Sequence, residues 1–396
     1  MSRFLFVVPP LVGHVNPALG IAQALARNGH EVAWTGSELS LRPLLGADAT
    51  VFPTGTRLHR PQADCGLAAL KSLWTRFVVP FARFTLPAVD KAVVAYEPDV
   101  VVVDQHTPTG AAVAHRHGLP WATLACSTIE LARPYRGLPK VEAWMRDLLL
   151  TLWTDAGLPE ADWHDQRFSP HLVLACAIRE LLGDNTFPDH VKLIGPPLAD
   201  RPGRDFDLGL LDLNRRRVLV STGTLADDVA DGFHARVLRA LEPLADRVQA
   251  ILVAPPEAVP APPPNVLVVP SVPMLRLLPH LDAVVSHGGL GTVNEALAHG
   301  VPLVVAPIRH DQPINAARVA SAGAGVRVSF ARVGPDALRD AISTVLDDPS
   351  YRAAAARLRD SITAAGGATV AARHLERLAR NGSDRVSAAV RQRGNG

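Results

Sequence analysis

The chain has 396 residues, 48% of them apolar, and its 40 basic and 38 acidic residues leave a formal net charge of +2. This length exceeds what one hydrophobic core usually serves, so it predicts two domains of roughly 200 residues each. The balanced charge provides no electrostatic footprint for DNA or RNA and argues against a membrane-surface role.

The N-terminal apolar run, Phe4–Pro10, is too short for a secretory signal, and no small-residue cleavage site follows it. No apolar stretch along the chain approaches the ~20 residues of a membrane helix. Three scattered cysteines, Cys65, Cys126 and Cys176, form no CxxC motif and so indicate neither a disulfide framework nor a zinc site. We therefore expect a cytoplasmic protein without a membrane span.

Short apolar runs alternate with helical patterns along the chain, which is typical of βαβ units. Such runs are the pattern of strands buried on both faces of a parallel sheet. They form two sets, which predict an α/β protein with two facing, Rossmann-like, doubly wound sheets. The first set is Phe4–Val8, Val100–Val103, Ala122–Ala125 and Leu172–Ala175, and the second is Val218–Ser221, Ala250–Val253, Val266–Val269, Ala283–Ser286 and Leu303–Ala306.

A polar segment rich in proline and glycine separates the two sets and predicts a linker. The predicted boundaries are a first domain at 1–198, the linker at 199–216 and a second domain at 217–380. Residues 381–396 are rich in Arg, Gly, Ser and Asn, and we expect this tail to be disordered.

Seven aromatic residues lie in the less regular stretch from about Leu58 to Trp163. We expect most of them to form a helical cover over the first sheet, and two or three to line an apolar ligand pocket that the sequence does not delimit. These residues are Trp74, Phe77, Phe81, Phe84, Trp144, Trp153 and Trp163.

The first strand leads into Pro-Leu-Val-Gly-His-Val-Asn-Pro, with Asn16 as the predicted helix N-cap and Pro17 as the first helical residue. His14 would then lie just before a helix N-terminus, whose partial positive charge should keep the imidazole neutral at pH 7, as a general base requires. Asp104 ends a second parallel strand on the same rim and could orient that imidazole. From the spacing alone, the favoured interpretation is a structural loop histidine and an N-capping aspartate.

The strongest motif is Ser-His-Gly-Gly-Leu-Gly-Thr-Val-Asn-Glu at residues 286–295, where a strand enters a glycine-rich turn and then a helix. Glycines allow close approach of the backbone to a ligand, and a helix N-terminus suits a diphosphate. As a dinucleotide motif it lacks the third glycine, because Asn294 stands there. The residues that could contact a bound nucleoside diphosphate are His287, Gly289, Gly291, Thr292 and Glu295.

Asp311 and Gln312 follow the predicted strand Leu303–Ala306. A carboxylate beside a carboxamide suits several sugar hydroxyls at once, since the carboxylate accepts and the carboxamide both donates and accepts. Alone, Asp311 could equally be a helix N-cap before Pro313. Its position sixteen residues after Glu295 favours the sugar-binding interpretation.

Residues 287–312 resemble the nucleotide-sugar signature of family 1, GT-B-fold glycosyltransferases, which include bacterial macrolide and antibiotic glycosyltransferases. The pattern is His-x-Gly-x-x-(Ser/Thr)-x-x-Glu, then Pro, then Asp-Gln. The resemblance implies that His287 and Thr292 contact the diphosphate, Glu295 the ribose, and Asp311 and Gln312 the sugar.

The turn at residues 220–224 resembles the phosphate-side loop of that family, which makes Ser221 and Thr224 further candidates. The family often stacks an aromatic residue on the base, but residues 271–274 read Ser-Val-Pro-Met and contain none. The backbone of Val272 could still bind the base edge. The base therefore stays open between uracil and thymine, which corresponds to a UDP- or dTDP-sugar.

The Pro-x-x-Gly-His-x-Asn-Pro stretch also resembles the family's N-terminal motif, in which His14 would be the catalytic base and Asp104 its partner. The family implies an inverting, metal-independent hexosyltransferase for natural-product, including antibiotic, biosynthesis. It would move a sugar to a hydroxyl of a small lipophilic acceptor, aromatic or macrolide-like, held by the first domain, with no cofactor besides the nucleotide sugar. The linker motif Asp205-Phe206-Asp207 is rejected as a metal site because it is not at a strand end.

Two alternatives remain at this point. A nucleotide-sugar epimerase would need the donor site but no acceptor pocket, and an inactive auxiliary protein would be expected to lose the base or the donor residues, both of which this chain retains. The sequence does not distinguish a monomer from a homodimer.

Overall fold

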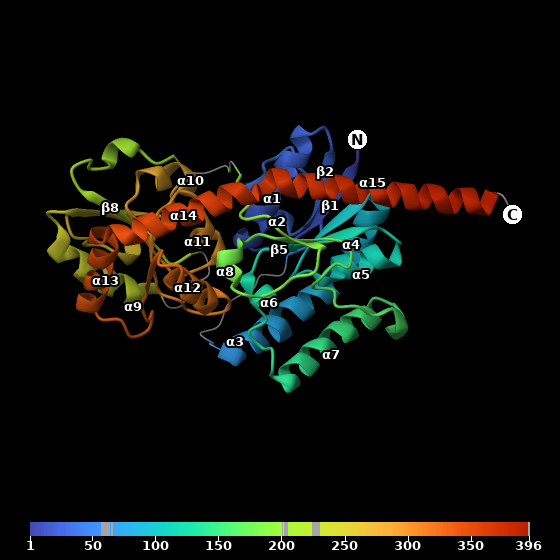
Figure 1. Cartoon of the computed structure of the whole chain (residues 1–396), viewed down its shortest axis with the longest axis horizontal. Coiled ribbons are helices and arrows are strands. Elements are labelled where there is room, and N and C mark those ends of the chain that lie inside the picture. The colour runs from blue at the N-terminus through green and yellow to red at the C-terminus, as the bar shows by residue number, and fades with distance from the viewer. Residues whose placement is uncertain (57–63, 65, 200, 202–204, 224–229, 395–396) are drawn as a thin grey trace.

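The computed structural model describes residues 1–56, 64, 66–199, 201, 205–223 and 230–394, and it forms two lobes, each built around a parallel sheet (Figure 1). Among these residues, the first sheet has seven strands in the order β3-β2-β1-β4-β5-β6-β7, and the second has six in the order β10-β9-β8-β11-β12-β13. Every neighbouring pair is parallel. The predicted fold class is confirmed.

The strands lie where the apolar runs predicted them, with four additions: β2, β3, β7 and β13. The first sheet comprises β1 Arg3–Val7, β2 Glu31–Gly36, β3 Thr50–Pro53, β4 Val100–Asp104, β5 Trp121–Ala125, β6 Val173–Ala175 and β7 Val191–Leu193. The second comprises β8 Arg216–Ser221, β9 Val248–Val253, β10 Val266–Val269, β11 Ala283–Ser286, β12 Leu303–Val305 and β13 Gly325–Arg327.

Helices cover both faces of each sheet, and separate apolar clusters fill the two sides of the first sheet. In the first lobe they are α1 Val12–Arg27, α2 Glu38–Leu45, α3 Gly66–Ser72, α4 Val79–Tyr96, α5 Pro108–Arg116, α6 Thr128–Ala132, α7 Pro139–Asp155 and α8 Arg179–Leu182. In the second they are α9 Ala230–Leu241, α10 Met274–Leu277, α11 Leu290–Ala298, α12 Gln312–Ser321, α13 Pro335–Asp347 and α14 Pro349–Ala365, followed by α15 Gly367–Gly394.

The C-terminal helix α15 returns to the first lobe, as the red helix along the top of Figure 1 shows. Gly366 ends α14 in the left-handed region at φ 78°, and α15 begins at the next residue. Ala371, Ala372, Leu375 and Ala379 join the core beneath α1. The last residues of the predicted second domain, up to 380, thus belong to a helix that buries its apolar face on the sheet of the first lobe.

The prediction of a disordered tail at 381–396 also differs from the structure, in which α15 continues to Gly394. Once a helix is nucleated by its packed turns, each added residue gains one backbone hydrogen bond at low cost. Residues 395–396 lie outside the described part of the chain.

The aromatic residues of the first lobe mainly form its helical cover, as expected. Trp74, Phe77, Phe81 and Trp153 are buried, whereas Phe84 is 45% exposed. The first three belong to an apolar cluster that joins the segment 70–82 to α7, and Trp144 and Trp163 pack against it half-buried. Within the described residues, no helix is both long and apolar enough to cross a membrane.

Candidate active site

Helix α1 begins earlier than the sequence predicts. Its first residue is Val12, Leu11 occupies the N-cap position without a side-chain cap, and Pro17 lies inside the helix. The Leu11 carbonyl accepts from the backbone N–H of His14 at 2.9 Å, which closes the first turn before Asn16. The predicted Asn16 cap is therefore wrong, and His14 lies in the first helical turn at the carboxyl end of β1.

His14 and Asp104 meet because β1 and β4 are adjacent and parallel. His14 Nδ1 lies 2.8 Å from Asp104 Oδ2, and the other carboxylate oxygen accepts from the backbone N–H of His106 at 2.8 Å. An ionised carboxylate only accepts, so Nδ1 carries the proton and Nε2 is left as the proton acceptor. The Asp104 side chain is fully buried and that of His14 is 13% exposed, which is the geometry of an oriented general base.

The electrostatics of this pair correct one expectation. Burial lowers the pKa of His14, but the charge and hydrogen bond of Asp104, together with the charge of Asp311, raise it above 6.5 overall. Burial conversely raises the pKa of Asp104, and His14 more than offsets it, so that this pKa is lowered. The net shift of the His14 pKa is therefore opposite to the one expected from the helix N-terminus, and the carboxylate of Asp104 in contact with the ring is its main cause.

His106 is a neighbour that the sequence reasoning missed. Its ring centroid lies 4.8 Å from that of His14. One ligand atom each from His14, Asp104 and His106 fall within 4.8 Å of one another, which is a spacing that could hold a metal ion. The only sequence signal was the Asp-Gln-His run that follows β4.

The glycine-rich turn after β11 is built around the His287 ring. A Cβ at Gly223 or Gly289 would lie 2.4 Å or 2.6 Å from ring atoms of His287, so both positions require glycine. Gly288 has φ 84°, and α11 starts at Leu290 as predicted, with Gly291 and Thr292 in its first turn. Burial lowers the pKa of His287 to about 4, so this imidazole is neutral at pH 7 and offers a phosphate a hydrogen bond but no charge.

Glu295 lies one turn further along α11 and is paired with a linker residue. Its Oε1 is 2.7 Å from Arg201 Nη2, and both side chains are largely buried. Burial raises the pKa of Glu295, and Arg201 offsets part of that rise. Arg201 was missed because the linker offered no motif that points to Glu295.

The two predicted sugar-binding residues have different surroundings. Asp311 occupies the N-cap position of α12 but makes no side-chain cap; its Oδ2 accepts from Asn315 Nδ2 at 3.2 Å. Burial raises its pKa, and its charge acts on His14, so the donor-side carboxylate lies close to the base. Gln312 Oε1 accepts from the backbone N–H groups of Ile308 and Arg309, both at 2.8 Å, and thus shapes its own loop.

The remaining candidates are less informative. Ser221 Oγ accepts from the backbone N–H of Gly223 at 3.4 Å. Val272 packs half-buried against the core of the second lobe. Thr224 lies outside the described residues.

Residues from both lobes line a cavity of about 40 Å³ between them. Thr128 Oγ1 donates to Asn315 Oδ1 at 2.6 Å, and Asn294 Nδ2 donates to the carbonyl of Cys176 at 2.8 Å, so side chains of α12 and α11 connect the lobes on this side. The cavity lining includes Gly13, Asn16, Cys126, Arg201, Gly291 and Glu295.

This geometry defines an α/β enzyme whose active site lies between two parallel-sheet lobes, and comparison with known proteins identifies its family. Residues 241–378 match the family model for the C-terminal domain of erythromycin biosynthesis protein CIII-like proteins. The 4'-demethylrebeccamycin synthase of Lentzea aerocolonigenes is 32% identical, over 92% of this chain and 96% of that protein. Demethyllactenocin mycarosyltransferase of Streptomyces fradiae is 30% identical, over 96% of this chain and 87% of that protein. The chain belongs to this family of GT-B glycosyltransferases.

Solved structures agree on the fold. The glycotransferase of kitacinnamycin is similar with a TM-score of 0.75 and 25% identity, over 95% of this chain and 99% of that one. Glycosyltransferase VinC, solved in complex with dTDP, is similar with a TM-score of 0.78 and 22% identity, over 96% of this chain and 100% of that one.

Proposed function

We propose that this glycosyltransferase is inverting and moves a sugar from a UDP- or dTDP-sugar to a hydroxyl of a small lipophilic natural product. The observation that carries the proposal is the buried His14–Asp104 pair at 2.8 Å, with the charge of Asp311 from the other lobe acting on the same imidazole. A base on the first lobe thus faces a candidate sugar-binding carboxylate on the second.

In the proposed reaction, His14 Nε2 removes the proton of the acceptor hydroxyl. The oxygen attacks the anomeric carbon opposite the departing nucleoside diphosphate, so that one C–O bond forms as the other breaks and the configuration inverts. Asp104 stabilises the imidazolium that results. Asp311 and Gln312 hold the sugar, with the Gln312 amide nitrogen as its donor, because the oxygen already serves the loop backbone.

The N-terminus of α11 stabilises the leaving diphosphate with its unpaired N–H groups. Thr292 and the neutral His287 add hydrogen bonds, and Ser221 lies on the neighbouring strand end. The ribose hydroxyls share the Glu295 carboxylate with Arg201. Because these groups can disperse the developing charge, we propose that the transfer needs neither a metal ion nor a cofactor besides the nucleotide sugar.

The acceptor class rests on the relatives. One is named for the transfer of a mycarosyl group in the lactenocin series and another for rebeccamycin synthesis. An aromatic or macrolide-like acceptor suits the aromatic-rich first lobe, and we expect the reaction to take place in the cytoplasm.

A matrix of UDP- and dTDP-sugars against phenolic and macrolide acceptors, read by mass spectrometry, tests the proposal. Products should carry one added sugar with an anomeric configuration opposite to that of the donor, as NMR can determine, and turnover should persist in EDTA. Incubation with the donor alone should give no epimerised sugar. Epimerised donor, or retention of configuration, would contradict the mechanism.

A further inference from the structure

Glu130 on α6 is a buried carboxylate that the proposed reaction does not use. The residue is 6% exposed, and its Oε2 pairs with Arg167 Nη1. Among the described residues, its Oε1 is buried without a hydrogen-bond partner. An unpaired buried carboxylate oxygen carries a substantial free-energy cost, so such a group calls for a specific explanation.

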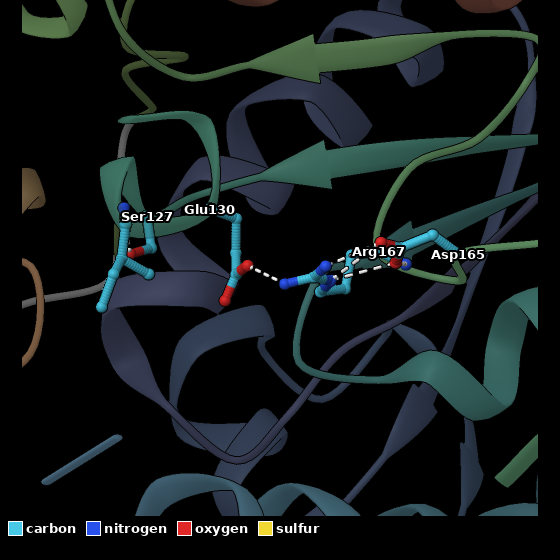
Figure 2. Close-up of polar contacts among 5 residues, drawn as sticks. Ser127, Glu130, Asp165 and Arg167 are labelled. Carbon is cyan, nitrogen blue, oxygen red and sulfur yellow. Dashed lines mark hydrogen bonds and ion pairs between the residues drawn. The ribbon is translucent and has the colours of Figure 1, made fainter. Parts of the chain in front are cut away.

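Arg167 holds this carboxylate in a fixed orientation (Figure 2). Its guanidinium also binds Asp165, with Nη2 2.7 Å from Oδ2 and Nε 3.0 Å from Oδ1. Two carboxylates therefore share one guanidinium, which leaves the group with a net negative charge. Figure 2 shows one Glu130 oxygen bonded to Arg167 and the other turned away from it.

Helix α6, which carries Glu130, lies beside the groups of the reaction centre. Thr128, the first residue of this helix, donates from Oγ1 to Asn315 Oδ1 at 2.6 Å, and Asn315 Nδ2 donates to Asp311 Oδ2 at 3.2 Å. The charge of Asp311 in turn acts on His14. The helix that carries the unpaired oxygen therefore adjoins the same group of residues as the base.

An apolar cluster lies near Glu130 and near the segment that leads to His14. Burial and the charge of Glu130 raise the pKa of Tyr135 to about 12, so that this ring is near the carboxylate. Tyr135 packs against the cluster that contains Trp74, and so does Leu11, the residue that caps α1 three positions before His14. The indole Nε1 of Trp74 is likewise buried without a partner among the described residues. An apolar cluster with an unpaired polar atom, flanked by Leu11 in the segment that leads to the base and by Tyr135 near Glu130, matches the chemistry of an acceptor site.

We propose that Glu130 Oε1 is the polar anchor of the acceptor, receiving a hydrogen bond from a hydroxyl or protonated amine that lies away from the reacting hydroxyl. This inference rests on the proposed function, since it takes the first lobe as the acceptor lobe. It narrows the acceptor class to apolar molecules with such a second donor group. Glu130 is thereby a specificity-determining residue and not a catalytic one.

Binding of three naphthols that share one hydroxyl tests the anchor without requiring turnover. They differ on the far ring, which carries a second hydroxyl, a protonated aminomethyl group or a methoxy group that cannot donate. Isothermal titration calorimetry on the wild-type chain should give a Kd for at least one donor-bearing naphthol about tenfold lower than for the methoxy compound. Preference for the amine alone identifies a cationic group, and preference for both shows that a neutral hydroxyl suffices.

Glu130→Gln should remove the preference, because the amide keeps an oxygen for Arg167 and replaces the free oxygen by a donor. Glu38→Gln is the matched control: Glu38 is ion-paired with Arg42 on the surface of the same lobe, and its loss should leave the preference unchanged. If Glu130→Gln lowers the Tm by several degrees, the binding test is repeated with Glu130→Asp. This substitution keeps the charge, but its shorter side chain moves the carboxylate oxygen away from the acceptor.

The outcomes separate this inference from the proposed function. Equal affinities in the wild type, a preference that survives in Glu130→Gln, or no binding of any naphthol would overturn the anchor, even if sugar transfer to other acceptors is observed. Conversely, a preference that disappears with Glu130, in a protein that transfers no sugar, would support the anchor and reject the reaction.

Discussion

At the scale of single residues, the pair His14 and Asp104 determines the pH dependence expected of the enzyme. In the proposed mechanism the neutral imidazole is the base, so kcat/KM should rise with pH through the pKa of His14, which Asp104 and Asp311 raise above that of an unperturbed histidine. Asp104→Asn removes the largest raising contribution while burial continues to lower the pKa. The rising part of the curve of kcat/KM against pH should therefore move to lower pH. The plateau value of kcat/KM should fall by roughly 100-fold or more, because the imidazolium loses its counter-charge.

Measurement of kcat/KM against pH for both proteins checks this prediction. A rising part in Asp104→Asn that coincides with that of the wild type would show that another group titrates. If the rising part moves as expected but nucleotide affinity also falls, the substitution has affected more than the base.

His287 makes a second prediction, which concerns stability. Its folded-state pKa of about 4 lies below the 6.5 of an unperturbed histidine, so the unfolded chain binds the proton first as the pH falls. The contribution of His287 to the free energy of unfolding should be fully present above pH 6.5 and should decrease by about 2 to 3 kcal/mol between there and pH 4. In urea titrations, His287→Gln should flatten the decrease by that amount. An unchanged slope would mean that the ring is protonated in the folded protein.

At the scale of elements, the interior strands except β2 were predictable, and most edge strands were not. Strand β4 is buried at every residue and is therefore a continuous apolar run. Strands β3, β7 and β13 lie at sheet edges and are partly exposed, so their short segments mix apolar and polar residues. The return of α15 to the first lobe was not predictable either, because nothing local pairs Leu375 with a core whose strands begin at residue 3.

The same distinction applies to the candidate site. That His14 and Asp104 lie on one rim follows from parallel strands alone, and the start of α11 follows from its glycine-rich turn. The ion pair of Arg201 with Glu295 and the pKa of His14 depend on contacts between distant segments. Local sequence patterns do not predict contacts of this kind.

Helix α15 provides a prediction at this scale. Leu375 is fully buried in the core of the first lobe, so Leu375→Ala should lower the free energy of unfolding by about 2 to 5 kcal/mol. Arg373→Ala, an exposed position on the same helix, should change it by less than about 0.5 kcal/mol. Urea denaturation compares the two. Equal small effects would indicate that α15 does not pack on the first lobe in solution.

At the scale of the whole molecule, the proposed mechanism requires the two lobes to lie together, and the hydrogen bond from Thr128 to Asn315 is one contact between them. Thr128→Val removes a hydrogen bond with a net contribution of about 1 kcal/mol, so kcat/KM should fall by roughly fivefold. The Kd of the nucleoside diphosphate should stay unchanged if the donor binds the second lobe alone, and Thr151→Val on the surface of α7 serves as control. A weaker nucleotide Kd would instead assign the Thr128 contact to the donor site.

The central claim, that an oriented imidazole on the first lobe activates the acceptor for a sugar held by the second, is tested most directly by His14→Ala. Product formation should be compared with the wild type, together with the Kd of UDP and dTDP and the Tm. The account predicts transfer reduced by roughly 100-fold or more with nucleotide affinity and Tm retained. Transfer at the wild-type rate in that variant would contradict it.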